Sequence, residues 1–349
     1  MQLGEITTRP KQDVLIQKIR NAVAECKREG KPARVLVQAP CGAGKTVISS
    51  AIMALALEKQ KTSAFIVRGR LLVTNKSRTL DRCGIHHAIL MNGHEFAQSN
   101  VTVVSVDSYT SRVIEREIIP VMNPDVWIID ECHISGCESY VKDGDVVIGF
   151  SATPAGKDGR GMGAFWSKLV IGPTYAELLA DGLLVPCKVF GESMPDLSGL
   201  VAHDGDWSQT KVSELMNTPE LVGDVLRDWK RWGEDRPTLG YASGIPQSIG
   251  LRDQFIAAGI PTAHVDKDTP EDEREEYFGQ LKAGRLKVIF NVGVLTTGVD
   301  FPFASCLVLA FATKSVIKFM QVCGRGLRTC DGKSDCKQVQ LWCGPGEYP

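Results

Sequence analysis

The sequence predicts an α/β protein made of two tandem domains, each a mostly parallel sheet flanked by helices. Three observations support this fold class. Short, continuous apolar runs recur along the chain, and such runs fit parallel strands that are buried on both faces. Stretches of helical character separate them, as right-handed crossover connections require. The alternation occurs twice within 349 residues, a length that suits two cores of ordinary size.

The expected strands form two sets. The first set comprises residues 34–38, 63–67, 101–106, 126–129 and 146–150, and the second 238–241, 262–265, 287–291 and 306–310. Helices are expected at 47–60, 219–232 and 246–258, and a closing strand at 337–343. The stretch 184–205 lacks helical periodicity and contains Pro186 and Pro195. We therefore expect the domains to span residues 1–187 and 188–349.

The composition is that of an ordinary globular protein, with 43% hydrophobic and 23% charged residues. Because the formal net charge is -1, any nucleic-acid-binding surface must be a local basic stripe. No apolar run is long enough to span a bilayer, and the N-terminus lacks a signal-peptide pattern. We therefore expect a cytoplasmic protein whose 11 cysteines are free thiols in a reducing compartment.

The strongest motif follows the first expected strand and opens an expected helix. It reads Ala39-Pro40-Cys41-Gly42-Ala43-Gly44-Lys45-Thr46 and departs from the phosphate-loop pattern only at Ala39, where the pattern has glycine. Its glycines let backbone N–H groups surround phosphates, and the helix N-terminus adds positive potential. We expect residues 40–46 to bind ATP, with Lys45 on the β- and γ-phosphates and Thr46 on Mg²⁺. The alternative is a glycine-rich turn that happens to end in Lys-Thr; the flanking strand and helix disfavour it.

Two carboxylates end the expected strand at 126–129. Asp130 and Glu131 follow Val-Trp-Ile-Ile directly, and parallel sheets place chemistry at the carboxyl ends of their strands. We expect Asp130 to hold Mg²⁺ through water and Glu131 to activate the attacking water as general base. A solvated acidic turn is the alternative, and the phosphate loop upstream makes it the weaker one.

The residues after the carboxylate pair are expected to couple the nucleotide state to the rest of the domain. His133 follows Cys132, and the segment that contains Ser151 and Thr153 ends the next expected strand. Hydrogen bonds between His133 and this segment are favoured over a metal site at Cys132 and His133.

A zinc site near the C-terminus is a weak hypothesis. Cys323, Cys330, Cys336 and Cys343 are separated by six, five and six residues, whereas common zinc sites use closely spaced CxxC pairs. The expected closing strand accounts for this segment better.

Several motifs occur in an order that resembles superfamily 2 helicases. Residues 44–46 (GKT), 130–133 (DECH) and 151–153 (SAT) resemble motifs I, II and III, and residues 291–300 (NVGVLTTGVD) and 321–328 (QVCGRGLR) resemble motifs V and VI. The match covers almost the whole chain. The resemblance implies two RecA-like domains that hydrolyse ATP in the cleft between them and move on or open nucleic acid.

Other segments extend the resemblance. Residues 151–161 and 177–186 are similar to the RadD-like and phage DEAD/DEAH-type branch, which implies a role on DNA in repair, recombination or phage replication. Such a protein would work in a bacterial cell or a phage-infected host cell. Arg9 and Gln12 look like the adenine-reading glutamine motif, with Lys11 where the family has an aromatic residue.

The second half of the chain contributes further residues by resemblance. Arg325 and Arg328 look like the arginines that reach the γ-phosphate, one of them as an arginine finger that stabilises transition-state charge. Gln321 looks like the residue that positions water or phosphate. Gly298 and Asp300 look like the motif V residues that sense nucleotide and join the two domains.

Candidate nucleic-acid contacts come from several segments. Arg68 and Arg70 lie in a stretch that resembles motif Ia, Ser108 and Arg112 in one that resembles motif Ib, and Ser243, Thr296 and Thr297 look similar in role. Hydroxyls and cations follow a phosphate backbone without reading bases. Each residue alone could equally lie in a solvated loop. The loop at 156–163 could touch DNA or cap a cleft.

Together these features predict an ATP- and Mg²⁺-dependent helicase or translocase acting on DNA, as a single strand or a junction. Three alternatives remain open: an ATPase that remodels or anneals nucleic acid, the motor subunit of a restriction or defence complex, and an RNA helicase. We identify no separation hairpin and no PD-ExK nuclease motif, and motif patterns do not distinguish DNA from RNA. The chain ends in GPGEYP, so we expect a minimal motor or a piece of a longer protein.

Overall fold

The structure is a computed structural model that describes residues 1–133, 136–142, 144–155, 161–191, 195–203, 206–295 and 301–341. Contacts divide it into two compact units, Met1–Glu177 and Leu178–Pro349. Val185 precedes the boundary that the sequence suggests, yet its N–H donates to the Leu327 carbonyl at 2.8 Å, and its side chain packs in the second unit's core. The division therefore falls before that expected boundary.

The first unit is built on one parallel sheet. Its elements are β1 (Gln2–Leu3), β2 (Ile6–Thr7), α1 (Pro10–Arg28), β3 (Arg34–Gln38), α2 (Lys45–Glu58), β4 (Ser63–Val67), α3 (Arg70–Arg82), β5 (Ala88–Leu90), β6 (Val101–Ser105), α4 (Val106–Tyr109), the π-helix η1 (Thr110–Glu115), β7 (Val126–Ile129), the 3-10 helix η2 (Cys137–Tyr140), β8 (Val146–Ser151) and β9 (Lys168–Ile171). Seven strands pair in the order β5-β6-β4-β7-β8-β3-β9, and all of these pairings are parallel. The carboxyl ends of β3, β7 and β8 are therefore neighbours on one edge.

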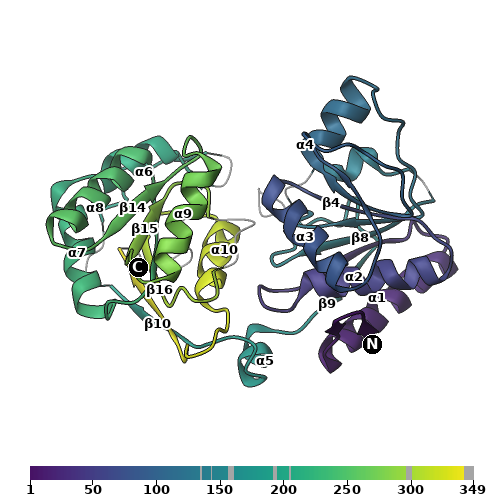
Figure 1. Ribbon diagram of the computed structural model, residues 1–349, viewed down its shortest axis with the longest axis horizontal. Coiled ribbons are helices and arrows are strands. Elements are labelled where there is room, and N and C mark those ends of the chain that lie inside the picture. The colour runs from purple at the N-terminus through teal and green to yellow at the C-terminus, as the bar shows by residue number, and fades with distance from the viewer. Residues whose placement is uncertain are drawn as a thin grey trace. The chain divides into compact units, whose positions relative to one another are not determined.

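Helices cover both faces of this sheet. Helices α1, α2 and α3 pack on one face (Figure 1), and α4 and η1 pack on the other through Tyr109 and Val113. Tyr109 meets Trp127 of β7 edge to face, with ring centroids 6.0 Å apart. Gly149 of β8 is required here, because a Cβ at this position would lie 2.2 Å from the Trp166 ring. The core thus fixes β7 and β8, the strands that end at the carboxylates and at Ser151.

The second unit repeats the architecture. Its elements are α5 (Tyr175–Ala180), which crosses the division, β10 (Cys187–Phe190), β11 (Ala202–His203), β12 (Asp206–Trp207), α6 (Gln209–Met216), α7 (Pro219–Trp232), β13 (Thr238–Ala242), α8 (Ile245–Ala257), β14 (Thr262–Val265), α9 (Glu271–Lys282), β15 (Val288–Asn291), β16 (Cys306–Ala310), α10 (Val316–Gly326) and β17 (Cys336–Gln340). The six-stranded sheet has the order β10-β17-β16-β13-β15-β14, again with parallel pairings throughout.

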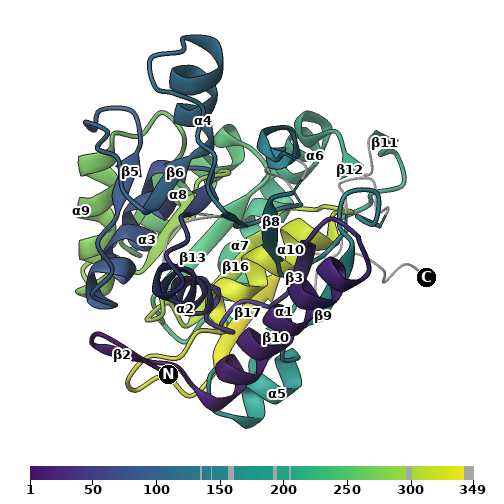
Figure 2. The same ribbon diagram turned by 90° about the vertical axis from the view of Figure 1, so that its right-hand side faces the viewer.

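The second sheet is also covered on both faces. Trp229 of α7 and Phe255 of α8 fill the core on one face, and Leu281 of α9 and Val322 of α10 fill the core on the other. Figures 1 and 2 show these helices along the green and yellow strands. Helix α7 begins where the sequence predicts, because the Thr218 hydroxyl accepts from Leu221 N at 3.4 Å and proline occupies the first turn.

The predicted fold class is confirmed: two parallel sheets are flanked by helices. All nine strands of the two expected sets are present. The closing strand begins one residue earlier than expected, at Cys336, and it ends at Gln340. In the two large sheets β5, β9 and β10 are not predicted by the sequence, and neither are the two-residue strands β1, β2, β11 and β12 outside them. They are short or carry exposed positions, so they lack the continuous apolar run that marks the central strands.

Candidate active site

The phosphate loop joins β3 to α2. Gly42 and Gly44 have φ values of 87° and 83°, a left-handed conformation that glycine adopts without strain. Gly44 caps α2, and its carbonyl accepts from Val47 N and Ile48 N at 3.0 Å each. Space also demands glycine at this position, because a Cβ on Gly44 would lie 2.2 Å from Gln12 Nε2.

Gln12 links the first turn of α1 to this loop. Its buried amide donates from Nε2 to the Ala43 carbonyl at 3.1 Å, and its Oε1 accepts from Arg9 N at 2.9 Å. One face of the phosphate loop is therefore fixed by α1. The adenine-reading role of Arg9 and Gln12 stays a prediction, and what the structure describes for Gln12 is this support of the loop backbone.

Lys45 and Glu131 form an ion pair at the carboxyl edge of the sheet. Lys45 Nζ lies 2.9 Å from Glu131 Oε1, and the two side chains are 16% and 19% exposed. Burial opposes the charge on Lys45, but the carboxylates of Glu131 and Asp130 outweigh it and raise the pKa of the lysine. Burial likewise raises the pKa of Asp130, against the attraction of Lys45. Lys45, at the end of the loop after β3, and the carboxylates that follow β7 therefore lie close together at this edge.

The backbone at the carboxylate pair is strained. Glu131 has φ 45°, which is uncommon for a residue that is not glycine and costs free energy. The neighbouring sheet bonds hold it there: Asp130 N donates to the Ile66 carbonyl and Cys132 N to the Phe150 carbonyl, both at 3.1 Å. Such strain concentrates at functional sites, and here it directs the Glu131 side chain toward Lys45.

His133 is hydrogen-bonded to the end of β8, as the sequence predicts. Its Nδ1 lies 2.9 Å from Ser151 Oγ and 3.5 Å from Glu131 Oε2. Ser151 Oγ donates its single hydrogen to the Thr153 carbonyl at 2.7 Å and accepts from Thr153 N at 3.0 Å. The hydroxyl therefore accepts from the imidazole, which assigns the proton to Nδ1. A continuous path connects Glu131 with the segment at Thr153.

Lys76 of α3 is a buried cation that the sequence argument missed. Its side chain reaches the first turn of α2, where Nζ donates to the Thr46 carbonyl at 3.1 Å, Ser49 Oγ at 2.7 Å and Ser50 Oγ at 2.8 Å. Burial lowers its pKa to about 7. All three ammonium hydrogens have acceptors, so Lys76 fixes the turn that carries Thr46. A signal was present: Val73, Lys76 and Leu80 share the buried stripe of α3.

We expect Lys76→Met to lower kcat/KM for ATP hydrolysis roughly 10- to 100-fold. Methionine keeps the length of the side chain but releases the Thr46 turn, and small displacements of positioning groups have effects of this size. Steady-state phosphate release, measured over a range of Mg²⁺ and ATP concentrations, reports the loss. The exposed Lys18 of α1 supplies the matched control, Lys18→Met. Equal kcat/KM in both variants would show that Lys76 does not support the active site.

The oxygen ligands at this edge fit Mg²⁺. The Thr46 hydroxyl and the Asp130 carboxylate belong to the hard donor class that Mg²⁺ prefers, and Mg²⁺ bound with a nucleotide uses one or two protein oxygens, phosphates and waters. No cluster of three or more His, Cys, Asp or Glu side chains suited to a metal occurs within the described ranges. Thr46 and Asp130 therefore fit a Mg²⁺ site in which phosphates and water supply the remaining ligands.

The motif VI residues lie on and just after α10 of the second unit. Gln321 and Arg325 are four residues apart on α10 and share a helical face, whereas Arg328 follows the helix and forms an isolated antiparallel bridge with Leu184. Arg325 is 9% exposed. Gly326 lets the helix approach the sheet, because a Cβ there would lie 2.5 Å from Cys336 Sγ. The motif V residues Thr296, Thr297, Gly298 and Asp300 lie outside the described residues.

The candidate nucleic-acid residues differ in their surroundings. Arg68 is exposed and lies 3.5 Å from Asp107, and Arg70 donates to the Asn92 carbonyl at 3.3 Å. Arg112 donates to the Met91 and His94 carbonyls at 3.3 and 3.1 Å. Ser108 and Ser243 are 2% and 8% exposed. Their hydroxyls contact backbone groups, Asn92 N at 2.8 Å and the Ala310 carbonyl at 3.5 Å. Arg68 and Arg70 are thus the exposed side chains among these five.

The described cysteines of the C-terminal segment are free thiols. Cys336 faces Cys187 in register across β17 and β10, and Cys323 lies on α10, where burial raises its pKa to about 12. Cys343 lies outside the described residues, as do residues 156–160 of the glycine-rich loop. Within the part of the chain that is described, no helix is long and apolar enough to cross a membrane.

A phosphate loop beside a strand that ends in Asp-Glu is the arrangement of P-loop nucleotide hydrolases. With a second parallel unit of like architecture, the class is that of proteins with two RecA-like domains. Two family profiles match the chain: "Type III restriction enzyme, res subunit" over residues 5–156 and "Helicase conserved C-terminal domain" over residues 242–330. The chain belongs to superfamily 2 of the helicases.

Individual proteins agree with this assignment. The "51.5 kDa protein" of Lactococcus phage (isolate 7-9) is 27% identical over 298 residues, which cover 84% of this chain and 62% of that protein. IRC3 of Saccharomyces cerevisiae, whose name describes an ATP-dependent helicase, is 28% identical over 334 residues, 88% of this chain and 48% of that protein. The chain thus spans about half to two thirds of these relatives.

A solved structure shows the same fold. The ATP-dependent Type ISP restriction-modification enzyme LlaBIII bound to DNA superposes with a TM-score of 0.69 and 16% identity. The superposition covers 99% of this chain and 28% of that one.

Proposed function

We propose that this chain is an ATP-dependent motor on nucleic acid, a helicase or translocase. The observation that carries the proposal is the Lys45–Glu131 ion pair at 2.9 Å. It brings the phosphate loop and the second motif to one point at the carboxyl edge of a parallel sheet, where nucleotide hydrolases place their chemistry.

The side chains of the first unit have distinct roles in hydrolysis. ATP phosphates bind to the backbone N–H groups of the loop, and Lys45 exchanges Glu131 for the β- and γ-phosphates. Glu131, released from Lys45, accepts the proton of the attacking water. Thr46 and Asp130 would hold Mg²⁺, which neutralises phosphate charge when bound. Glu131 directs the water because the strained backbone at φ 45° fixes its orientation.

The second unit supplies the cations that complete the reaction. Arg325 and Arg328 would meet the γ-phosphate when the domains close, Gln321 would position the water, and Gly298 and Asp300 would sense the nucleotide. Hydrolysis then depends on domain closure, and this dependence couples chemistry to movement along a strand. His133 carries the same signal to Ser151 and Thr153 through the bonds of 2.9 and 2.7 Å.

DNA is the polymer that we favour. One matching profile describes a restriction enzyme subunit, and the restriction-modification enzyme of like fold is bound to DNA. Arg68 is exposed beside the carboxyl edge, where a cation contributes to a phosphate track without reading bases. The remaining candidates are Arg70, Ser108, Arg112, Ser243, Thr296 and Thr297.

A second candidate function has support of its own. The profile over residues 5–156 and the likeness to LlaBIII both concern restriction enzymes, so the chain could be the motor part of such an assembly. In that case, DNA movement would require a partner chain, whereas ATP hydrolysis would use the same residues.

Replacing Lys45 by alanine tests the proposed function. We expect kcat for ATP hydrolysis to fall about 10²- to 10³-fold, the loss that follows removal of one preorganised phosphate ligand, and strand displacement on forked DNA to stop. Phosphate release and a fluorescent strand-separation assay measure both. Lys59→Ala, at an exposed position just after α2, is the control. Full ATPase activity in Lys45→Ala would refute the motor assignment.

A further inference from the structure

A cavity of about 400 Å³ opens between α1, α2 and the amino ends of β7 and β8. Its floor is apolar: Ile52 and Ile148 are 7% and 3% exposed, and Leu55 and Val146 are half-buried. Nine of its fifteen lining residues are aliphatic and none is aromatic or acidic. The volume lies in the range of sites that hold bulky ligand groups.

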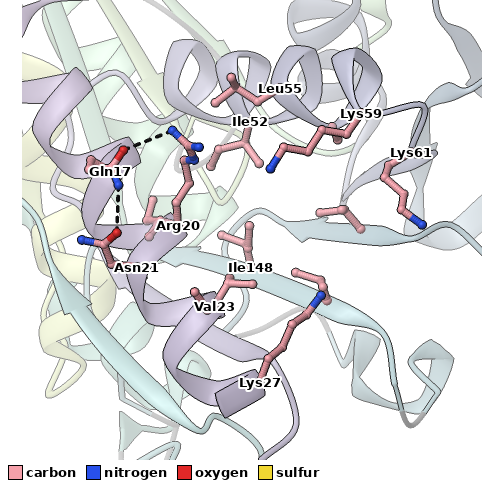
Figure 3. Close-up of a pocket in the computed structure, with 15 residues that line it drawn as sticks. Gln17, Arg20, Asn21, Val23, Lys27, Ile52, Leu55, Lys59, Lys61 and Ile148 are labelled. Atoms are coloured by element: carbon pink, nitrogen blue, oxygen red, sulfur yellow. Dashed lines mark hydrogen bonds between the residues drawn. The ribbon is translucent and has the colours of Figure 1, made fainter. Parts of the chain in front are cut away.

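Basic side chains surround the opening. Figure 3 shows Arg20, Lys27, Lys59 and Lys61 around the apolar floor. Lys61 pairs with Asp125 at 2.8 Å, and Arg20 donates to the neutral Gln17 Oε1 at 3.1 Å. Lys27 and Lys59 have no ion pair among the residues that the structure describes, and both are exposed. Within the described part of the chain, Arg20, Lys27 and Lys59 thus lie around an apolar cavity without an ion-pair partner.

The cavity is separate from the active site. Lys45 begins α2 at the carboxyl edge of the sheet, and Lys59 follows its last turn at the amino edge. The helix between them is roughly 20 Å long. A ligand in the cavity would therefore leave the phosphate loop open.

We infer that this cavity is a docking site for a partner protein, which inserts an acidic amphipathic segment. One or two leucine-like side chains would fill the apolar floor, and carboxylates beside them would pair with Arg20, Lys27 and Lys59. This is the helix-in-groove mode, with apolar anchors at i, i+3 and i+4. Charge complementarity determines that the partner segment is acidic, and the apolar floor favours bulky aliphatic anchors.

Nucleic acid fits this surface less well. Single strands bind proteins through bases stacked on aromatic rings, and no aromatic residue lines the cavity. A phosphate backbone is hydrated and gains nothing from an aliphatic floor. The basic rim combined with an apolar floor therefore favours a peptide.

The test uses a fluorescein-labelled helical peptide of about 14 residues, with leucines at i, i+3, i+4 and i+7 and glutamates between them. Fluorescence anisotropy with the full chain measures its binding. We expect Lys27→Glu/Lys59→Glu to weaken binding about tenfold or more through charge repulsion. We expect Ala24→Trp, which fills the cavity from the exposed face of α1, to do the same without a change of charge.

The experiment has two matched controls, one a variant of the protein and one a variant of the peptide. Lys211→Glu reverses an exposed charge on α6, and a peptide with serine in place of leucine keeps the glutamates. We expect Lys211→Glu to bind the leucine peptide as wild type does, and the serine peptide to bind more weakly than the leucine peptide. These results would distinguish docking in the cavity from attraction between net charges. Basal ATP hydrolysis and the melting temperature should be unchanged in the cavity variants, because none of these residues belongs to the active site.

Three results would overturn the inference. They are equal affinity of wild type and Ala24→Trp for the leucine peptide, equal binding of the serine peptide, and displacement of the leucine peptide by a short oligodeoxynucleotide. The last result would identify the rim as a nucleic-acid contact. Selective loss in both cavity variants, with Lys211→Glu unaffected, would support peptide docking.

Discussion

Replacing Glu131 by glutamine is expected to lower kcat for ATP hydrolysis about 10²- to 10⁴-fold, the usual contribution of a general base. Glutamine has nearly the same shape and can still accept a hydrogen bond from Lys45, whose Nζ now lies 2.9 Å from Glu131 Oε1. It cannot take the proton of the attacking water. ATP binding should remain close to that of wild type, because the phosphate loop is unchanged.

Single-turnover phosphate release and equilibrium binding of a fluorescent ATP analogue separate these two effects. Glu58→Gln is the matched control, since Glu58 is exposed at the far end of α2. A Glu131→Gln variant that turned over within a few-fold of wild type would assign the base to another group. A variant that lost ATP binding would show that Glu131 acts on the loop instead.

Replacing Arg328 by alanine is expected to lower kcat about 10³-fold, the size of an arginine-finger contribution. Stimulation of hydrolysis by nucleic acid should also disappear, because closure of the domains would no longer complete the site. Arg328→Lys should recover only part of the activity, since lysine keeps the charge but not the planar fork that binds phosphate at two points. Steady-state hydrolysis with and without single-stranded DNA measures both effects.

Arg325 is tested in the same way through Arg325→Lys, because its 9% exposure makes a truncation there a risk for folding. The exposed Arg285 provides the control, Arg285→Ala. If Arg328→Ala altered neither turnover nor its stimulation by DNA, the assignment of Arg328 to the γ-phosphate would be wrong.

The central strands and the phosphate loop are predictable because local sequence determines them. A continuous apolar run such as Val126–Ile129 suits a strand buried on both faces, and Gly44 suits a left-handed helix cap. Edge strands are harder to predict from the sequence. β9 pairs with β3 although Leu169 and Ile171 are about half exposed, so the apolar pattern that marks a central strand is diluted.

Tertiary contacts account for what the sequence argument missed. Lys76 lies outside every motif that the sequence indicates, and only the packing of α3 on α2 brings its ammonium group to the Thr46 carbonyl. Gln12 is assigned to adenine by resemblance, whereas the structure describes its bond to the Ala43 carbonyl. Ser108 carries a hydroxyl suited to phosphate, yet burial commits that hydroxyl to Asn92 N. The residue type predicts which interactions a side chain can make, and the fold determines which partner lies within reach.

The measurement that tests the central claim most directly is the steady-state ATPase rate of the full chain. It would be measured without polymer, with single-stranded DNA, with forked DNA and with RNA of matching sequence. The Lys45→Ala variant provides the background rate of ATP hydrolysis. We predict strong stimulation by DNA and weaker stimulation by RNA. A rate that none of the polymers changes would contradict a nucleic-acid motor in this chain alone.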